Sequence, residues 1–507
     1  MNHWVILPIL LPALVAPLIA LAMRFDIVLA RVFSVASATL LVVIAAILTG
    51  MVVDGSVLSY ALGNWVAPFG IVLVLDRLSA MMLLLTSVVG LCVLLYTING
   101  WDKRGQHFHA LFQFQLMGIN GAFLTGDLFN LFVFFEVLLI ASYGLMVHGG
   151  GALRVKAGVQ YVVINLIGST LFLFAVGLIY SVTGTLNMAD LAVGVRDVRA
   201  ADQALLHTGA ILLLVVFAVK AALVPVQFWL PGTYANAPAP VAALFAIMTK
   251  VGAYSIIRVY TLIFGGTSDE VAWIAQPWLV PASMLTLVIG ALGVLASRSL
   301  GQMVSFAVIA SMGTLLMTVG VFTHEAMAAA LYYMLHSTLA AAALFLVVDL
   351  VTERRPGQAD LLSVAPRFHQ VGLIAGFFFL AAIAMAGLPP LSGFLGKLLI
   401  LDAVRDAPQA VAMWALILIT SLLIIVGFAR GGSTLFWKSS AVEGSIHSRV
   451  RPRALPYFAL GALVGATVLL TAFAGPVMLY LEETAYQLFN PGDYQSAVLF
   501  GGFAGGR

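Results

Sequence analysis

Long apolar runs separated by short polar breaks repeat along the whole chain. A membrane-spanning helix needs about 20 mostly apolar residues, and fourteen runs meet that length. The runs are 4–23, 28–52, 73–98, 108–125, 128–147, 159–182, 207–226, 240–263, 271–296, 302–322, 327–351, 371–403, 409–430 and 455–480. No stretch of soluble-domain composition interrupts the series. The pattern predicts an all-α polytopic membrane protein, with about fourteen transmembrane helices in one bundle.

Composition narrows the class further. Of the 507 residues, 62% are hydrophobic and 9% are charged, whereas a soluble domain carries roughly 25% charged residues. The chain therefore has too little charge to be a soluble globular enzyme or a disordered chain, and its net charge of +3 gives no nucleic-acid footprint. Its one cysteine, Cys92, excludes a disulfide framework and a cysteine-ligated zinc or iron–sulfur centre. We expect no cofactor and no metal.

The basic residues predict the orientation in the membrane. Odd-numbered loops hold fifteen of them: Arg24, Arg31, Lys103, Arg104, Arg154, Lys156, Arg298, Arg354, Arg355, Arg367, Arg430, Lys438, Arg449, Arg451 and Arg453. Even-numbered loops and tails hold six: Arg77, Arg196, Arg199, Arg258, Arg405 and Arg507. The positive-inside rule then places the odd loops in the cytoplasm and both termini outside the cell membrane. Because no basic residue precedes the first span, that span is expected to be a retained helix rather than a signal peptide.

Three lysines fall deep within the predicted spans, namely Lys220, Lys250 and Lys397, and so do Glu136 and His336. A charge at the helix centre costs about 2.5–3.5 kcal/mol, so such residues need a reason. One alternative is that a lysine snorkels to the interface. Lys250 lies about ten residues, or roughly 15 Å, from either end of its span, which is too deep for snorkelling. The alternative is stronger for Lys220 and Lys397, and His336 has the alternative of a neutral core histidine bonded to a carbonyl.

These five residues suit a proton relay. Burial disfavours the charged form of both lysine and glutamate, and a nearby opposite charge favours it. A small change in the separation of a buried Glu–Lys pair therefore releases or captures a proton. Lysine fits this role because its charge state changes readily on burial, whereas arginine stays charged. The sequence uses lysine, never arginine, at these deep positions.

Two spans carry helix breakers close to a deep lysine. Pro225 and Pro231 follow Lys220, and Lys397 follows a second group, which consists of Gly387, Pro389, Pro390 and Gly393. Proline frees a helix carbonyl, which is tolerated in a membrane only against protein or a wet cavity. Broken helices in corresponding halves of a transporter indicate an ion path, although a simple packing kink is the alternative. We expect Gln227–Tyr234 to be a short interfacial segment anchored by Trp229 and Tyr234.

The breaks divide the chain into regions. The spans predict an N-terminal part (1–107), a first five-helix repeat (108–263), a second, inverted repeat (271–430), and a basic loop with the last span and tail (431–507). His324 and Glu325, at the outer mouth of the eleventh span, are candidates for an external proton entrance, with a solvated loop as the alternative. Asp349, near the inner end of that span, is expected at the interface.

Several segments carry a resemblance to a known family. FAVKAALVPVQFWLPGTYANAPAPVAALFAIMTKVGAYSIIR, GDLFNLFVFFEVLLIASYGL, YSVTGTLNMADLA and AGLPPLSGFLGKLLIL are similar to signatures of the antiporter-like proton-translocating subunits. That superfamily comprises large membrane subunits of complex I and of multisubunit Mrp-type cation/proton antiporters. Gln227, where complex I subunits usually have histidine, favours the Mrp branch.

The resemblance implies roles for the deep residues. In the family, a glutamate on the fifth helix pairs with a lysine on the broken seventh, and these positions fall on Glu136 and Lys220. Further family positions on helices eight, eleven and twelve fall on Lys250, His336 and Lys397. The resemblance also implies other membrane subunits as partners, within the lipid bilayer, and exchange of H⁺ for Na⁺ or K⁺.

Three hypotheses follow. The first is a proton-translocating antiporter subunit that exchanges cytoplasmic Na⁺ or K⁺ for external H⁺. The second is a proton-pumping membrane subunit of a redox complex, either a complex I-like quinone oxidoreductase or a membrane-bound hydrogenase. The third is a passive membrane scaffold, in which neutralising the deep charges leaves transport intact.

Overall fold

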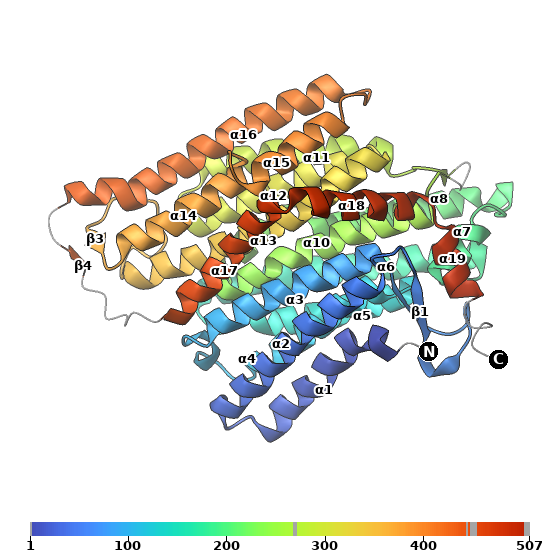
Figure 1. Cartoon of the computed structure of the whole chain (residues 1–507), viewed down its shortest axis with the longest axis horizontal. Helices are drawn as coiled ribbons and strands as arrows, with labels where there is room; N and C mark the ends of the chain where they lie inside the picture. The colour runs from blue at the N-terminus through green and yellow to red at the C-terminus, as the bar shows by residue number, and fades with distance from the viewer. Residues whose placement is uncertain (1–2, 267–270, 443–444, 447–453, 501–507) are drawn as a thin grey trace.

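The structure is a computed structural model that describes residues 3–266, 271–442, 445–446 and 454–500. In Figure 1 the helices lie side by side as one elongated bundle, with α1 (Leu7–Ala22) at one edge and α16 (Ala410–Gly432) at the other. Among the described residues, 12 helices are long and apolar enough to cross a membrane. The all-α membrane fold is confirmed. The number fourteen stays a prediction, because α4 has 17 residues and α14 has 16, which is short for a span.

The helices of the first half follow in chain order. They are α2 (Ile27–Met51), α3 (Arg77–Thr97), α4 (Phe108–Leu124), α5 (Leu128–Met146), α6 (Ala152–Thr183), α7 (Met188–Gly194), α8 (Gln203–Ala221), α9 (Trp229–Asn236) and α10 (Ala239–Leu262). Those of the second half are α11 (Gln276–Ala296), α12 (Leu300–Val319), α13 (His324–Arg354), α14 (Val371–Ala386), α15 (Ser392–Ala403), α17 (Ala454–Ala472), α18 (Ala474–Phe489) and α19 (Gly492–Leu499). The last predicted span, 455–480, thus continues as two helices to Phe489.

The same order of elements occurs twice. α4, α5, the 32-residue α6, the interrupted pair α8/α9 and α10 are followed by α11, α12, the 31-residue α13, the interrupted pair α14/α15 and α16. Both predicted breaks are therefore present. The boundaries of the two repeats and their inverted relation stay predictions.

A short hairpin holds both ends of the described chain together. β1 (Leu58–Ala61) pairs antiparallel with β2 (Val72–Leu75), while β3 (Arg367–Phe368) and β4 (Ser445–Ile446) form a second, parallel pair. In β1, Tyr60 contacts the His3 ring, and the Ser59 hydroxyl donates to the Ala497 carbonyl at 2.7 Å. The N-terminal end of α1 and the short helix α19 therefore lie at the same end of the bundle (Figure 1).

Odd-numbered loops meet at the opposite end. Arg31 pairs with Asp102 at 2.5 Å, and Arg104 pairs with Glu353 at 3.3 Å. His148 also bonds the Trp101 carbonyl at 2.8 Å, which ties a fourth loop to the same place. Which side of the membrane this end faces stays a prediction. Of the counted basic residues, four lie outside the described part of the chain, namely Arg449, Arg451, Arg453 and Arg507.

Among the described residues, two of the basic residues counted in even-numbered loops lie within helices. Arg258 is in the last two turns of α10 and only 3% exposed, and Arg77 begins α3 with 7% exposed. Both are paired or bonded inside the protein rather than solvated. Arg258 is thus a buried arginine, and Asp76 neutralises its charge.

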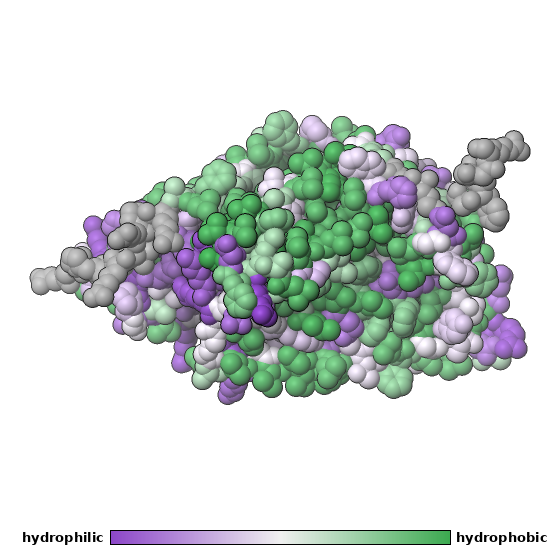
Figure 2. Space-filling model, turned by 90° about the horizontal axis from the view of Figure 1, so that it is seen from below, coloured by the Kyte–Doolittle hydropathy of each residue, from purple (hydrophilic) through white to green (hydrophobic). Residues whose placement is uncertain are grey.

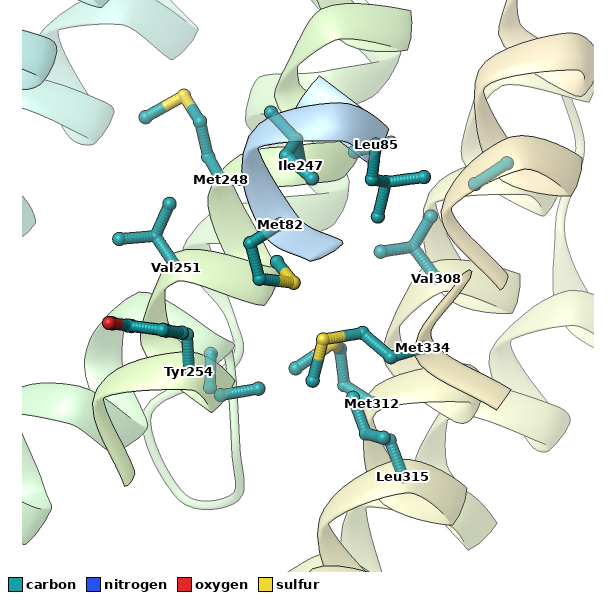
Figure 3. Close-up of a cluster of buried hydrophobic side chains, with 14 of the residues drawn as sticks. Met82, Leu85, Ile247, Met248, Val251, Tyr254, Val308, Met312, Leu315 and Met334 are labelled. Atoms are coloured by element: carbon teal, nitrogen blue, oxygen red, sulfur yellow. The ribbon is translucent and has the colours of Figure 1, made fainter. Parts of the chain in front are cut away.

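The core surrounds α10 and α13. Every residue of α10 is buried, although its sequence is less apolar than that of the outer helices. Figure 3 shows apolar side chains of α3, α10, α12 and α13 interlocking around Met82, Val251, Met312 and Met334. The outer helices expose much apolar surface, and hydrophobic residues cover most of the face seen in Figure 2. A lysine on α10 is thus held at the centre of the bundle.

Candidate functional site

The first break lies directly after Lys220. α8 ends at Ala221, and α9 begins at Trp229 after a turn that contains Pro225. The Trp229 indole donates to the Val219 carbonyl at 3.0 Å, which satisfies one acceptor that the helix end leaves free. Pro231 lies inside α9. At this break, α9 therefore contacts the end of α8 through Trp229.

The structure corrects the prediction that Trp229 and Tyr234 anchor an interfacial segment. Trp229 and Tyr234 are 3% and 2% exposed, and the Tyr234 hydroxyl donates to the Phe245 carbonyl at 2.8 Å. Both aromatics are buried among helices, so neither is free to anchor the segment among lipid headgroups. The segment is the second half of a broken helix.

Lys220 and Glu136 each form a hydrogen bond with a side chain of α6. The Lys220 ammonium nitrogen donates to Asn165 Oδ1 at 2.9 Å and lies 5.6 Å from the centre of the Phe135 ring. Glu136 on α5 is half-buried and accepts a hydrogen bond from the Ser169 hydroxyl. The charge of Glu136 acts on Lys220, yet no nitrogen–oxygen distance of 4.0 Å or less joins these two described residues.

Lys250 lies one helix further in. Its side chain is 0% exposed, and Nζ has no hydrogen-bond partner among the described residues. Two residues on, Gly252 lets α10 approach α8, because a Cβ there would lie 2.6 Å from the Ala221 amide nitrogen. The absence of a side chain at Gly252 thus brings the two lysine-bearing helices into contact.

His336 connects the two halves of the site. It is 0% exposed on α13, and its Nδ1 hydrogen-bonds with the Ser392 hydroxyl at the start of α15, at 2.9 Å. The Ala384 carbonyl, near the end of α14, also acts on the ring. Both Lys250 and Lys397 are near enough for their charges to act on it as well. The histidine therefore contacts both sides of the second break and faces the central lysine.

Lys397 lies beyond the second break. Its Nζ donates to the Ala386 carbonyl and to the Ser421 hydroxyl, both at 2.7 Å. Gly387 has a φ of 81° and ends α14, and a Cβ there would lie 2.7 Å from Lys397 Cδ. Pro389 and Pro390 fill the turn before α15. The break thus supplies both the free carbonyl and the space that the lysine occupies.

His324 and Glu325 begin α13 and are exposed. They line a cavity of about 930 Å³ together with Asp402, Arg405, Asp406, Glu482 and Glu483. Five carboxylates against one arginine and one histidine make this cavity acidic. It lies at one end of the helix that holds His336 at its middle.

Asp349 is 2% exposed, and its expected position at the membrane interface stays a prediction. The Tyr96 hydroxyl and the Trp101 indole each donate to its Oδ2 at 2.8 Å. It borders another cavity, of about 390 Å³, at the end of α13 opposite His324. The sequence analysis did not assign five of these polar residues to the relay, namely Asp349, Asn165, Ser169, Ser392 and Ser421.

Comparisons with known proteins show the family to which the chain belongs. Residues 125–424 match the family model described as "NADH:quinone oxidoreductase/Mrp antiporter, TM". The chain is 42% identical to a probable K(+)/H(+) antiporter subunit of Rhizobium meliloti, over 100% of this chain and 99% of that one. It is 37% identical to an Na(+)/H(+) antiporter subunit of Bacillus subtilis, over 98% and 100%. Both relatives are D-type subunits.

Solved structures give the same result. A chain of the Mrp complex from Dietzia sp. is 30% identical, with a TM-score of 0.86 over 98% of this chain and 100% of that one. A chain of the membrane-bound sulfane sulfur reductase, an archaeal respiratory membrane complex, is 26% identical, with a TM-score of 0.86 over 98% and 99%. Matches of this extent show that the chain belongs to the NADH:quinone oxidoreductase/Mrp antiporter membrane family, in the group of D-type antiporter subunits.

Proposed function

We propose that this chain is the proton-translocating subunit of a multisubunit monovalent cation/proton antiporter. It exchanges cytoplasmic Na⁺ or K⁺ for external H⁺ through Glu136, Lys220, Lys250, His336 and Lys397. The observation that carries the proposal is Lys250, fully buried at the centre of the bundle with no partner for its amine among the described residues. A buried amine without a partner is costly to keep charged, so packing alone gives no reason for a lysine at this position.

The geometry supports a gate followed by a relay. Glu136 and Lys220 face the same helix, α6, and a change in their separation alters how firmly Lys220 holds its proton. Lys250 and His336 then lie between that gate and Lys397. Lys397 donates hydrogen bonds to two neutral acceptors, the Ala386 carbonyl and the Ser421 hydroxyl, which do not fix its charge.

His324 and Glu325 are proposed as the external proton entrance. The acidic cavity that they line raises the local concentration of cations, protons included. From there α13 leads to His336, which lies twelve residues, or roughly 18 Å, further along the helix. With this assignment both termini face outward, as the distribution of basic residues predicts.

The partners are other membrane subunits of the same antiporter. Relatives that span this chain's full length are named as antiporter subunits, and the Dietzia chain belongs to a complex. Apolar faces on the outer helices, such as α1 and α16, are available to lipid and to those subunits. No cofactor is needed, because the proposed chemistry is proton transfer between side chains.

The test neutralises the gate in the complete complex. Glu136→Ala and Lys220→Ala are expected to abolish the cation-driven pH gradient in inverted vesicles, while the partner subunits still copurify. Lys156→Ala removes an exposed lysine and is the matched control. Normal antiport in both gate variants would refute the relay, and Lys220→Met, which keeps the length of the side chain, replaces any lysine variant that does not assemble.

The second candidate is a proton-pumping subunit of a redox complex. It is favoured by the 26% identical chain of an archaeal respiratory complex. The partners distinguish the two. Copurification with iron–sulfur proteins would favour the redox complex, and copurification with small membrane subunits alone would favour the antiporter.

A further inference from the structure

α6 bonds both members of the proposed gate. The Ser169 hydroxyl donates to Glu136 Oε1 on α5, and Asn165 Oδ1 accepts from the Lys220 ammonium on α8 at 2.9 Å. Asn165 and Ser169 are four residues apart, so they share one face of α6, one turn from each other. They are 1% and 6% exposed. Two buried polar side chains on one helical face thus contact the two gate charges separately.

The orientation of each contact is fixed. Asn165 Nδ2 donates to the Tyr161 carbonyl at 2.8 Å, which turns Oδ1 towards Lys220. Ser169 has a single hydroxyl proton, and it forms the hydrogen bond to Glu136. Neither side chain can reverse its contact without losing a buried hydrogen bond.

These contacts replace a direct ion pair. Glu136 and Lys220 are more than 4.0 Å apart in the described structure, although the charge of one acts on the other. Opposite charges in a medium of low dielectric attract strongly, so a direct pair is the favoured contact unless each group has another partner. α6 supplies that other partner to both groups.

We propose that Asn165 and Ser169 are positioning residues that hold the gate in a separated state. The proposal rests on the proposed function, since it assigns α6 a role in that same gate. Removing the Ser169 donor frees the Glu136 carboxylate to pair directly with Lys220. A direct pair holds the ammonium proton more firmly, so release needs a higher pH.

The experiment measures the pH dependence of cation-driven proton transport by the complete complex in inverted vesicles. Ser169→Ala and Asn165→Leu remove one contact each, and Ser169→Thr restores the hydroxyl. Thr170→Val is the matched control, because this neighbour on α6 is exposed and bonds only its own helix, at the Leu166 carbonyl. Assembly is checked by copurification of the partner subunits.

The expected result is an alkaline shift of about one pH unit in the half-maximal pH of Ser169→Ala, because an opposite charge in direct contact favours the charged form of Lys220. Asn165→Leu is expected to shift the same way, while Ser169→Thr and Thr170→Val keep the original profile. An unshifted profile in assembled Ser169→Ala would overturn the proposal, as would an equal shift in Thr170→Val. If one variant does not assemble, the other decides by the same criterion. Retained antiport in Glu136→Ala and Lys220→Ala would instead refute the gate itself.

Discussion

Asp76 and Arg258 form a buried ion pair between α3 and α10, and the structure predicts different effects on stability for two ways of removing it. Both terminal nitrogens of Arg258 donate hydrogen bonds to the Asp76 carboxylate, at 2.6 and 2.8 Å. The side chains of Arg258 and Asp76 are 4% and 2% exposed. Asp76 also caps α3 by accepting from the Ser79 amide at 2.9 Å. We expect Asp76→Asn to leave Arg258 buried with an uncompensated charge.

The magnitude follows from that burial. Breaking a buried pair on one side costs about 3–5 kcal/mol, because the remaining charge stays out of water. Replacing both partners by apolar residues of similar volume is often neutral or stabilising by about 1–4 kcal/mol. Losing the α3 cap takes about 1 kcal/mol from that gain. Asp76→Asn is therefore expected to cost about 3–5 kcal/mol, and Asp76→Leu with Arg258→Met roughly nothing.

The assay is unfolding of the purified chain in mixed micelles, compared at the denaturant midpoint. Asp202→Asn, which breaks the exposed pair with Arg199, is the control and is expected to change stability by less than about 1 kcal/mol. A single variant as stable as the wild type would contradict the reasoning. So would a double variant that is less stable than Asp76→Asn.

Two further predictions concern stability and packing. Burial opposes ionisation of Asp102, but Arg31 and His109 outweigh it and lower its pKa to about 2; about 1–2 kcal/mol of stability is therefore present at pH 7 and lost between about pH 4 and pH 2. Asp102→Asn should lower the unfolding temperature at pH 7 and leave it unchanged near pH 2, and equal losses at both pH values would contradict this. Gly252→Ala places a methyl group against the α8 backbone and should cost about 1–3 kcal/mol, with a matching loss of transport. The control is Gly177→Ala, where an added Cβ meets nothing within 4 Å, and an equal effect in both variants would refute the packing argument.

The sequence predicted the helical bundle and the deep residues well, because both depend on local properties. Apolar length identifies a span, and depth within the span identifies Lys250 as too far from either interface to snorkel. The two breaks were also readable, since proline and glycine act on their own backbone. What the sequence could not show is which side chains meet across helices.

The missed residues share that reason. Asn165 and Ser169 are ordinary polar residues in an apolar span, and only their spacing of four hinted at a shared face. Trp229 looked like an interfacial anchor because aromatic residues favour headgroups, yet the fold turns its segment inward. Arg258 was counted with the loop residues although it lies inside the predicted span 240–263, and its partner Asp76 pairs with it only once α3 and α10 pack.

The central claim is that protons cross the bundle by way of its unpartnered buried amine. The most direct measurement reconstitutes the complete complex in proteoliposomes and records internal pH while a Na⁺ or K⁺ gradient is imposed, with Lys250→Met compared against wild type. Methionine fills a similar volume without a charge, so we expect the variant to assemble, to be at least as stable as the wild type, and to move no protons. Proton movement at the wild-type rate in Lys250→Met would contradict it.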